Sequence, residues 1–284
     1  MAGQRAPGAR IETAGGRWSD TGRSMSTKAS VRRPFLATRM MASSLQYVGE
    51  VSSLFAQTLR ALFRTEDPFP HMVSIGINTM PIALLTIAFS GMVLALYTAR
   101  QMQEYGLGSF VGGLVAVTMT REMAPVLAAV VLAARAGSAI AAELGTMKVT
   151  EQIDALRSMA TSPLRYLVVP RFIACVSMLP LLALFGMVVG TFGGYIVATT
   201  VGIANAAYLD SVRQFVTMGD VVNGMIKTVV FGAIIAMVAC HQGLNTSGGA
   251  SGVGAATTRS VVLCIIFVYA ADFVIVRLFV AGPA

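Results

Sequence analysis

Two long stretches of the chain contain no charged residue: residues 72–99 and residues 172–209 hold no Lys, Arg, Asp or Glu. A helix needs about 20 apolar residues to cross the hydrocarbon core of a bilayer, so each stretch is long enough for one crossing. The same criterion applied along the chain predicts an all-α membrane protein with five transmembrane segments. We place these segments at about residues 74–99, 108–141, 168–200, 221–242 and 259–280.

The third segment is too long for one straight crossing. Its closely spaced glycines offer both a small-residue packing face and a place where the helix can tilt or bend. These glycines are Gly186, Gly190, Gly193 and Gly194. A re-entrant piece of chain is the alternative for this segment.

The residues before the first segment follow other patterns. Residues 1–34 are rich in Gly, Arg, Ser and Ala without apolar periodicity, which predicts a disordered basic tail. Within residues 35–66, apolar side chains recur at steps of three and four, which predicts an amphipathic helix lying on a membrane surface. An ordinary soluble helix packed on a partner is the alternative. Residues 70–284 then form the transmembrane domain.

The charge distribution favours membrane orientation over nucleic-acid binding. The net charge is +8, but ten of the 21 basic residues precede Pro68. Cytoplasmic segments of membrane proteins carry an excess of Lys and Arg, so this basic lead-in predicts a cytoplasmic amino terminus and, after five crossings, an external carboxyl terminus. The mean hydropathy of +0.72 and the charged fraction of 12% also fit a multi-pass protein.

No motif in the chain predicts an enzyme or a cofactor site. Cys175, Cys240 and Cys264 lie in apolar runs without metal-ligand spacing, so we interpret them as small buried hydrophobic residues. The Gly-rich stretch 242–258 lacks the GxxxxGK[ST] spacing of a phosphate-binding loop and is interpreted as a tight cytoplasmic loop. Neither HExxH nor GxSxG occurs.

The most unusual feature within the segments is the pair Arg121-Glu122, which interrupts the second one. Charges at this depth are costly and usually face a cavity or a partner. Pro125 removes the hydrogen bond that the Arg121 carbonyl would accept, which predicts a kink at the same level. The pair therefore suggests a site for a polar substrate group or a gate; an Arg–Glu contact that only fixes helix packing is the alternative. We expect Lys227 to snorkel toward a membrane surface.

A short helix is predicted in the loop between the second and third segments. Thr150 can cap it, and Asp154 lies in its first turn, where a carboxylate favours the helix dipole. Ile153, Leu156 and Ala160 form one apolar stripe, and Ser162-Pro163 ends the helix. Such a helix could dock in a groove on a motor protein or lie in the lipid interface.

The residues of this region also carry a family resemblance. The stretch TREMAPVLAAVVLAARAGSAIAAELGTMKVTEQIDALRSMATSPLRYLVVPR closely resembles the central part of the MlaE/YrbE permeases, and the resemblance continues through GTFGGY, IKTVVFGAIIA and HQGLNTSGGASGVGAATTRSVV. It covers about residues 40–280. It implies a homodimeric, non-catalytic permease subunit of an ABC transporter in the bacterial inner membrane, which moves phospholipids or related hydrophobic lipids.

The resemblance also implies partners and site residues. The partners are a cytoplasmic ABC ATPase, which binds the ATP, and an MCE-domain lipid-binding protein on the outer side. Arg121 and Glu122 would lie near an outward-facing lipid cavity, and residues 35–66 would form an interfacial elbow helix. The coupling helix on the ATPase would comprise Glu151, Gln152, Ile153, Asp154, Leu156, Arg157 and Met159.

Two other functions stay open from the residues alone. In an ion-coupled secondary transporter, Arg121, Glu122 and Asp272 would couple substrate to protons or sodium, although no internal repeat supports such a fold. A structural membrane anchor for a lipid-binding partner would tolerate neutralisation of Arg121 and Glu122.

Overall fold

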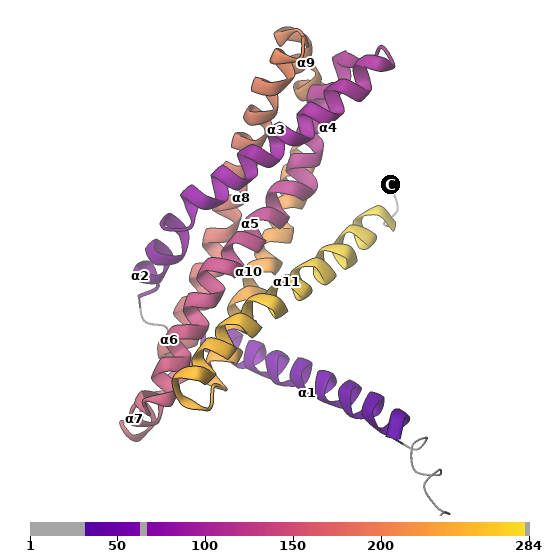
Figure 1. The fold of residues 1–284 in the computed structure, drawn as a ribbon. Helices are drawn as coiled ribbons and strands as arrows, with labels where there is room; N and C mark the ends of the chain where they lie inside the picture. Colours follow the sequence, from indigo (N-terminus) through magenta and orange to yellow (C-terminus); the bar gives the residue numbers. More distant parts are fainter. Residues whose placement is uncertain (1–31, 63–66, 282–284) are drawn as a thin grey trace, which may run out of the picture. The chain divides into compact units, whose positions relative to one another are not determined.

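The computed structural model describes residues 32–62 and 67–281, and all regular secondary structure in these residues is helical (Figure 1). The chain divides into two compact units, residues 1–47 and residues 48–284. The helix α1 (Arg32–Ala61) begins in the first unit and ends in the second. Of the predicted basic tail, residues 1–31 lie outside the described residues.

The second unit contains all the other helices. In chain order they are α2 (Phe69–Met72), the π-helix η1 (Val73–Ile77), α3 (Met80–Glu104), the 3-10 helix η2 (Gly108–Phe110), α4 (Val111–Thr118), the π-helix η3 (Met119–Met123), α5 (Ala124–Leu132), the π-helix η4 (Ala133–Gly137), α6 (Ser138–Val149), α7 (Gln152–Ser158), the π-helix η5 (Leu164–Val168), α8 (Val169–Thr200), α9 (Asn205–Phe215), α10 (Met218–Leu244) and α11 (Gly249–Ala281).

Five continuous helical stretches are long and apolar enough to cross a membrane, which confirms the predicted all-α membrane fold. They run over Phe69–Glu104, Gly108–Val149, Leu164–Thr200, Met218–Leu244 and Gly249–Phe279. The prediction of a loop over residues 242–258 is wrong for most of its length. The helix α11 already begins at Gly249, so only residues 245–248 connect it to α10, and positive φ angles at Gly248 (91°) and Gly249 (67°) make the turn.

The helix α3 shows how the spans are packed. Small residues and one isoleucine recur every four positions on its buried face: Ala83, Ile87, Gly91, Ala95 and Ala99. Large apolar side chains cover the opposite, exposed face: Ile82, Leu85, Phe89, Val93 and Tyr97. Helices in lipid pack through small residues and leave large ones to contact acyl chains, so this distribution fits a membrane environment.

The buried face of α3 packs along α8, and the glycines of α8 make the contact close. A Cβ added at Gly91 would lie 2.1 Å from the Gly190 carbonyl oxygen, and one added at Gly193 would lie 2.8 Å from that of Ala88. The predicted small-residue face is therefore confirmed. The helix α8 is continuous over its 32 residues with Pro180 inside it, so the re-entrant alternative is wrong.

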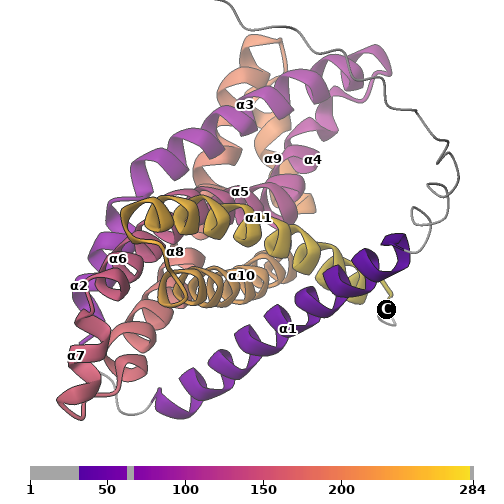
Figure 2. The ribbon, with the colours of Figure 1, turned by 60° about the horizontal axis from the view of Figure 1, so that its bottom comes forward.

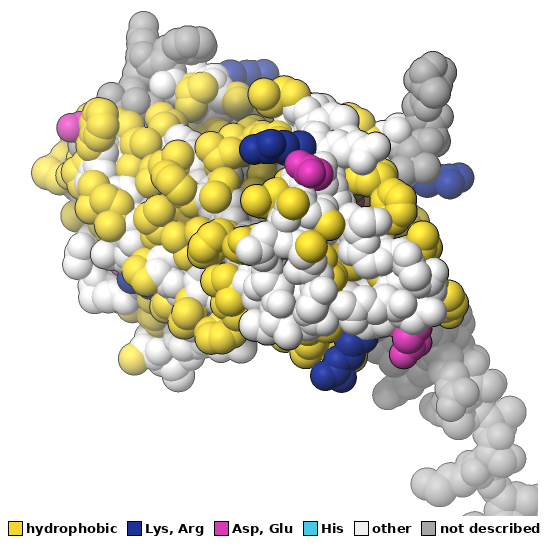
Figure 3. Space-filling view, turned by 90° about the horizontal axis from the view of Figure 1, so that it is seen from above, with side chains coloured by type: hydrophobic (Ala, Val, Ile, Leu, Met, Phe, Trp, Pro, Cys, Tyr) yellow, Lys and Arg dark blue, Asp and Glu magenta, His cyan; other side chains and the backbone are white. Residues whose placement is uncertain are grey.

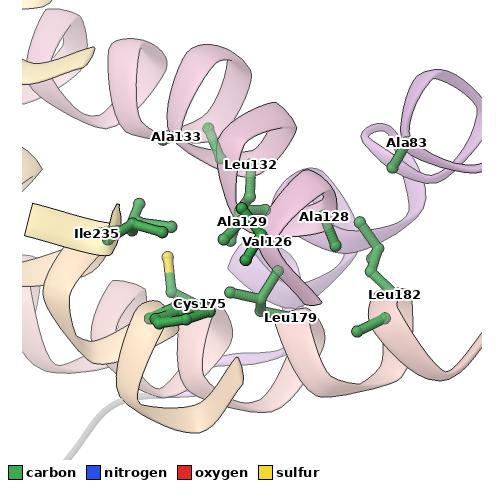
Figure 4. Close-up of a cluster of buried hydrophobic side chains, with 14 of the residues drawn as sticks. Ala83, Val126, Ala128, Ala129, Leu132, Ala133, Cys175, Leu179, Leu182 and Ile235 are labelled. Atoms are coloured by element: carbon green, nitrogen blue, oxygen red, sulfur yellow. The ribbon is translucent and has the colours of Figure 1, made fainter. Parts of the chain in front are cut away.

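The centre of the second unit is an apolar core where α5, α8 and α10 meet, and α10 lies between α8 and α11 (Figure 2). Figure 4 shows Leu132, Cys175, Leu179 and Ile235 from these three helices converging in this core, and all four are fully buried. Cys240 and Cys264 are also buried and free, so the interpretation of the three cysteines as small buried hydrophobic residues is confirmed.

The two ends of the membrane unit differ. One end carries α7 and the α10–α11 turn, and the other carries α9 and the α3–α4 connection (Figure 1). Figure 3 looks onto the α9 end, whose surface is dominated by hydrophobic and uncharged side chains, with few charged ones. The alternation of the spans places the start of α2 at the α7 end, so the predicted orientation would make this end cytoplasmic.

The helix α9 is an element that the sequence analysis missed. It lies outside the five spans and packs on α4, where the Ser211 hydroxyl accepts a 2.7 Å hydrogen bond from the Gly113 amide. Tyr208 is 1% exposed and donates to the Thr191 carbonyl at 3.1 Å, and burial raises the pKa of Tyr208 to about 12. The spacing of Tyr208, Val212 and Phe215 is the helical signal that could have revealed it.

Candidate functional site

Arg121 lies in the π-helix η3 and is held by Asp220 at the start of α10. Its Nε donates a 2.5 Å hydrogen bond to Asp220 Oδ1. The other oxygen of Asp220 accepts from the amide and the hydroxyl of Thr217, at 2.8 and 2.9 Å, and this capping box begins α10. The Asp220 side chain is 2% exposed, whereas that of Arg121 is 55% exposed. A buried, fixed carboxylate thus orients an exposed guanidinium.

Glu122 pairs with Lys227 of α10, not with Arg121. Lys227 Nζ donates to Glu122 Oε2 at 2.6 Å and lies 3.1 Å from Asp272 Oδ1 of α11. The prediction that Lys227 snorkels to a membrane surface is wrong, because its side chain is only 4% exposed and three oxygens converge on its ammonium group. Lys227 is also the partner of Asp272 that the sequence did not reveal.

The third oxygen that contacts the Lys227 ammonium is a backbone carbonyl of η3. Pro125 leaves the Arg121 carbonyl without its usual intrahelical donor, and Lys227 Nζ donates to that carbonyl at 3.1 Å. The same stretch forms the π-helical turn η3, a feature often found at functional sites. Where the sequence predicted a kink, the structure has a π turn whose free carbonyl accepts a hydrogen bond from a side chain of another helix.

A cavity of about 540 Å³ lies beside the Arg121–Asp220 pair. Its walls come from α4, η3, α8, α9 and the start of α10, and none of its lining residues is charged. They are Ala116, Thr120, Leu184, Met187, Val188, Thr191, Phe192, Tyr195, Tyr208, Leu209, Val212, Val216 and Val221. Thr120 and Val221 are the sequence neighbours of Arg121 and Asp220, so the ion pair adjoins the cavity without lining it. A mostly apolar cavity of this size suits part of a hydrophobic ligand.

The predicted coupling helix is α7, but its predicted N-cap is wrong. Thr150 does not cap it, since the Thr150 hydroxyl donates to the Thr146 carbonyl and Glu151 occupies the N-cap position. Glu151 and Ala160, at the two ends of α7, have left-handed φ angles of 60° and 57°. Such angles are uncommon for residues other than glycine and often mark functional segments.

The apolar stripe of α7 faces the protein's own interior. Ile153 is 1% exposed and Leu156 is partly buried against the core, while Ala160 is exposed beyond the end of the helix. Ile153 borders a cavity of about 390 Å³ with Glu50 of α1 and His241 of α10, which lie 3.0 Å apart. The buried part of the stripe therefore faces this cavity, and most of the exposed side chains of α7 are polar.

The exposed surface of α7 comprises Glu151, Gln152, Asp154, Arg157 and Met159. Asp154 lies between two cations, with Lys148 Nζ at 3.2 Å and Arg157 Nη1 at 2.9 Å. The hydrogen bond from Lys148 lowers the pKa of Asp154 below its usual range, and Arg157 adds to the shift. The seven predicted coupling residues thus divide into five exposed residues, of which all but Met159 are polar, and an inward pair, Ile153 and Leu156.

The fold and this arrangement agree with the relationships of the chain. A family model described as permease MlaE matches residues 69–278. The chain belongs to the MlaE permease family. This MlaE permease is 40% identical to a probable ABC transporter permease protein of Synechocystis over 88% of its own length and 94% of the relative. It is also 40% identical to a probable ABC transporter permease protein of Rickettsia typhi, over 73% and 81% of the two chains.

A third relative of the MlaE permease is a plant protein. Protein TRIGALACTOSYLDIACYLGLYCEROL 1, chloroplastic, of Arabidopsis thaliana is 40% identical over 73% of this chain and 59% of the relative. Together, the family and the five spans identify a multi-pass membrane permease subunit of an ABC transporter, a non-catalytic component that works with a cytoplasmic ATPase. Membership of this family argues against an ion-coupled secondary transporter.

Proposed function

We propose that this MlaE permease moves phospholipids or related hydrophobic lipids between the bacterial inner membrane and an MCE-domain partner. In this proposal two copies of the chain form a homodimer, and a separate cytoplasmic ATPase supplies the energy. The observation that carries the proposal is the uncharged 540 Å³ cavity beside an exposed, anchored arginine. Apolar walls next to a cation match the two parts of a phospholipid.

Arg121 is suited to a phosphate headgroup. Asp220 engages its Nε, and no described residue hydrogen-bonds its two terminal nitrogens. A guanidinium with free terminal nitrogens can bind phosphate through two parallel hydrogen bonds. Because Asp220 fixes the side chain in advance, little conformational entropy is lost when the headgroup binds.

The whole charged cluster favours a headgroup that carries both signs. Two cations, Arg121 and Lys227, face three carboxylates, Glu122, Asp220 and Asp272, so the cluster has a formal net charge of −1. Glu122 remains 41% exposed despite its bond to Lys227. Arg121 would bind the phosphate and Glu122 an ammonium group of the same zwitterionic lipid, while Lys227 stays buried as a positioning residue.

The helix α7 provides a mechanical link between this cluster and the ATPase. Its polar surface would seat on the ATPase, and its inward pair Ile153 and Leu156 transmits the push to the body of the permease. The span that precedes α7 is continuous from Gly108 to Val149. The 28 residues from Arg121 to Val149 extend about 42 Å at 1.5 Å per residue. Closing of the ATPase dimer would thus act on the cluster through one helix and squeeze the cavity.

The name of the Arabidopsis relative refers to a galactolipid, which supports a lipid as the cargo of this chain. The competing proposal of a structural anchor assigns no role to an anchored guanidinium beside an apolar cavity. It predicts that lipid occupancy is unaffected by changes to the cavity wall.

A cavity-filling pair of variants tests the proposal. Val188→Trp fills the cavity, whereas Val93→Trp adds the same side chain on the exposed face of α3, outside the cavity; the two valines are 65% and 54% exposed. Native mass spectrometry of the full chain would count bound phosphatidylethanolamine. We expect Val188→Trp to lose about tenfold in occupancy and Val93→Trp to match wild type. Equal occupancy in all three proteins would refute the cavity as the lipid site.

A further inference from the structure

A second, smaller cavity lies at the α7 end, where the first three spans meet. It measures about 140 Å³ and shares no lining residue with the large cavity. Unlike the large cavity it has charged residues in its walls, and its charged and polar lining residues are His71, Ser74, Arg135, Glu143 and Arg171. The transport site proposed above makes no use of these residues.

The Arg171 guanidinium lines this cavity and has one nitrogen without an acceptor among the described residues. Its side chain is 7% exposed; Nη2 donates to Glu143 Oε2 at 2.9 Å and Nη1 to the Leu167 carbonyl at 2.8 Å. Its Nε is buried without a hydrogen-bond acceptor among the described residues. A buried charged donor left unpaired is costly, so an anion bound beside this guanidinium would stabilise it.

Arg135 supplies a second guanidinium. Its Nη1 donates to the Thr79 hydroxyl at 3.1 Å, and within the described part of the chain no hydrogen bond engages its Nε or Nη2. Glu143 is 58% exposed, so it pairs with Arg171 from the rim of the cavity. With His71 neutral, two arginines and one carboxylate give the cavity a formal net charge of +1, which attracts an anion.

The backbone near the smaller cavity contains π-helical turns. Two π-helical turns border the cavity, since η1 contributes Ser74 and η4 contributes Arg135. A third, η5, supplies the Leu167 carbonyl that binds Arg171. Single π turns inside helices are rare and occur frequently at functional sites. Three independent spans thus adopt the same irregular geometry at or near this cavity.

We propose that this cavity binds a phosphate group, held by Arg135 and Arg171. Its volume corresponds to about five waters at roughly 30 Å³ each, which admits a phosphate and excludes acyl chains. The source is either the headgroup of an anionic lipid whose chains stay in the bilayer or a free phosphate. This site is distinct from the transport cavity, and binding to it requires neither ATP nor the ATPase.

The depth of Arg135 suits a lipid headgroup. The second span has 42 residues and is about 63 Å long, roughly twice the ~30 Å hydrocarbon core, so each end of a centred span projects about 16 Å. Arg135 lies 14 residues, or about 21 Å, from the end at Val149. Its backbone is therefore about 5 Å inside the hydrocarbon boundary, and its side chain can reach the headgroup layer.

Two ligand comparisons with the delipidated full-length chain separate the sources. The first measures by native mass spectrometry the binding of phosphatidic acid and of diacylglycerol with identical chains, which differ only in the phosphate. The second measures thermal stabilisation by inorganic phosphate against chloride at equal ionic strength. Arg135→Gln removes one guanidinium, and Ala139→Leu fills the cavity from α6 without removing a charge. Arg165→Gln, an exposed arginine at the same end, is the matched control.

We expect Arg135→Gln and Ala139→Leu each to weaken phosphatidic acid binding about tenfold or more, with one lipid fewer per chain, while Arg165→Gln stays within twofold of wild type. Loss of stabilisation by inorganic phosphate in the same two variants, with lipid binding unchanged, would also support the site and identify free phosphate as the ligand. Wild-type behaviour of both variants with both ligands would overturn the proposal. Because no arm involves transport, this failure is separate from a failure of the proposed function.

Discussion

Replacement of Lys227 by Met is the most informative single change in the charged cluster. The Lys227 side chain is 4% exposed and faces Glu122 at 2.6 Å and Asp272 at 3.1 Å. Methionine has a similar length and no charge, so the variant keeps the volume but removes the ammonium. It leaves the Asp272 carboxylate, only 17% exposed, without its cation within the span.

The expected cost follows from this loss of pairing. Removal of one partner of a buried ion pair destabilises by about 3–5 kcal/mol, since the other charge stays buried. The Arg121 carbonyl also loses its donor, at a further cost of about 1 kcal/mol. Asp272→Asn alone should cost less, because Lys227 then keeps Glu122 and the carbonyl. The double variant Lys227→Met with Asp272→Asn should recover more than about 1 kcal/mol relative to Lys227→Met, since no carboxylate remains unpaired at that position.

Unfolding in mixed micelles, followed by circular dichroism, would give the free energy of unfolding for the four proteins of this double-mutant cycle. A coupling energy near zero between Lys227 and Asp272 would refute the reasoning. An unchanged stability for Lys227→Met would refute it equally.

Three further predictions concern other parts of the molecule. Gly91→Ala should destabilise the fold by several kcal/mol, because the added Cβ would meet the backbone of α8 at 2.1 Å. Gly254→Ala has open space around its Cβ and should stabilise α11 by about 0.5–1 kcal/mol. Unfolding measurements that give both changes the same sign would contradict this prediction. Tyr208→Phe should cost about 1 kcal/mol through loss of its hydrogen bond, and the wild-type chain should retain one tyrosine that ionises only near pH 12 in an ultraviolet titration, a signal that Tyr208→Phe removes. The pKa of Asp154 is lowered in the folded chain, so its ion pairs are complete above its unfolded pKa and are lost only as the pH falls through the lowered value. A carbon NMR titration of Asp154 should therefore find a lower midpoint in wild type than in Lys148→Gln. Equal midpoints would count against the contact between Lys148 and Asp154.

The spans and their packing could be predicted because they depend on local composition. Long apolar runs, two of them free of charge, identified the crossings, and the spacing of Gly186, Gly190, Gly193 and Gly194 identified a small-residue face that meets α3. The loop prediction for residues 242–258 failed for a physical reason. Glycine lowers helix propensity in water, but in a membrane protein small residues are common in helices because they allow close packing.

The charged site could be predicted only in part. Arg121 and Glu122 were recognisable as charges within an apolar segment, but their partners lie 99 and 105 residues away in the chain. No local pattern connects such positions. Lys227 was misplaced because its distance from the predicted start of the segment suggested a surface position, whereas three oxygens from η3 and α11 stabilise it in the interior.

For the helix α7, the sequence predicted the helix but not the surface that covers its apolar stripe. Its presence was predictable from Ser162-Pro163 and the apolar spacing, but the direction of its apolar stripe was not. Ile153 faces the cavity shared with α1 and α10, so the sequence pattern that suggested knobs for a partner reflects packing within the chain. Periodicity shows that a helix has an apolar face and leaves open which surface covers it.

The central claim is that α7 couples a lipid-filled permease to its ATPase. Lipid-stimulated ATP hydrolysis and lipid transfer to an MCE-domain acceptor, measured with the reconstituted complex, test it directly. Asp154→Arg reverses the charge between Lys148 and Arg157 on the exposed surface of α7, and Asp210→Arg makes the same change on exposed α9 at the opposite end. We predict that Asp154→Arg abolishes lipid stimulation and transfer while the permease stays folded, and that Asp210→Arg behaves as wild type. Unchanged stimulation and transfer in Asp154→Arg would contradict the account.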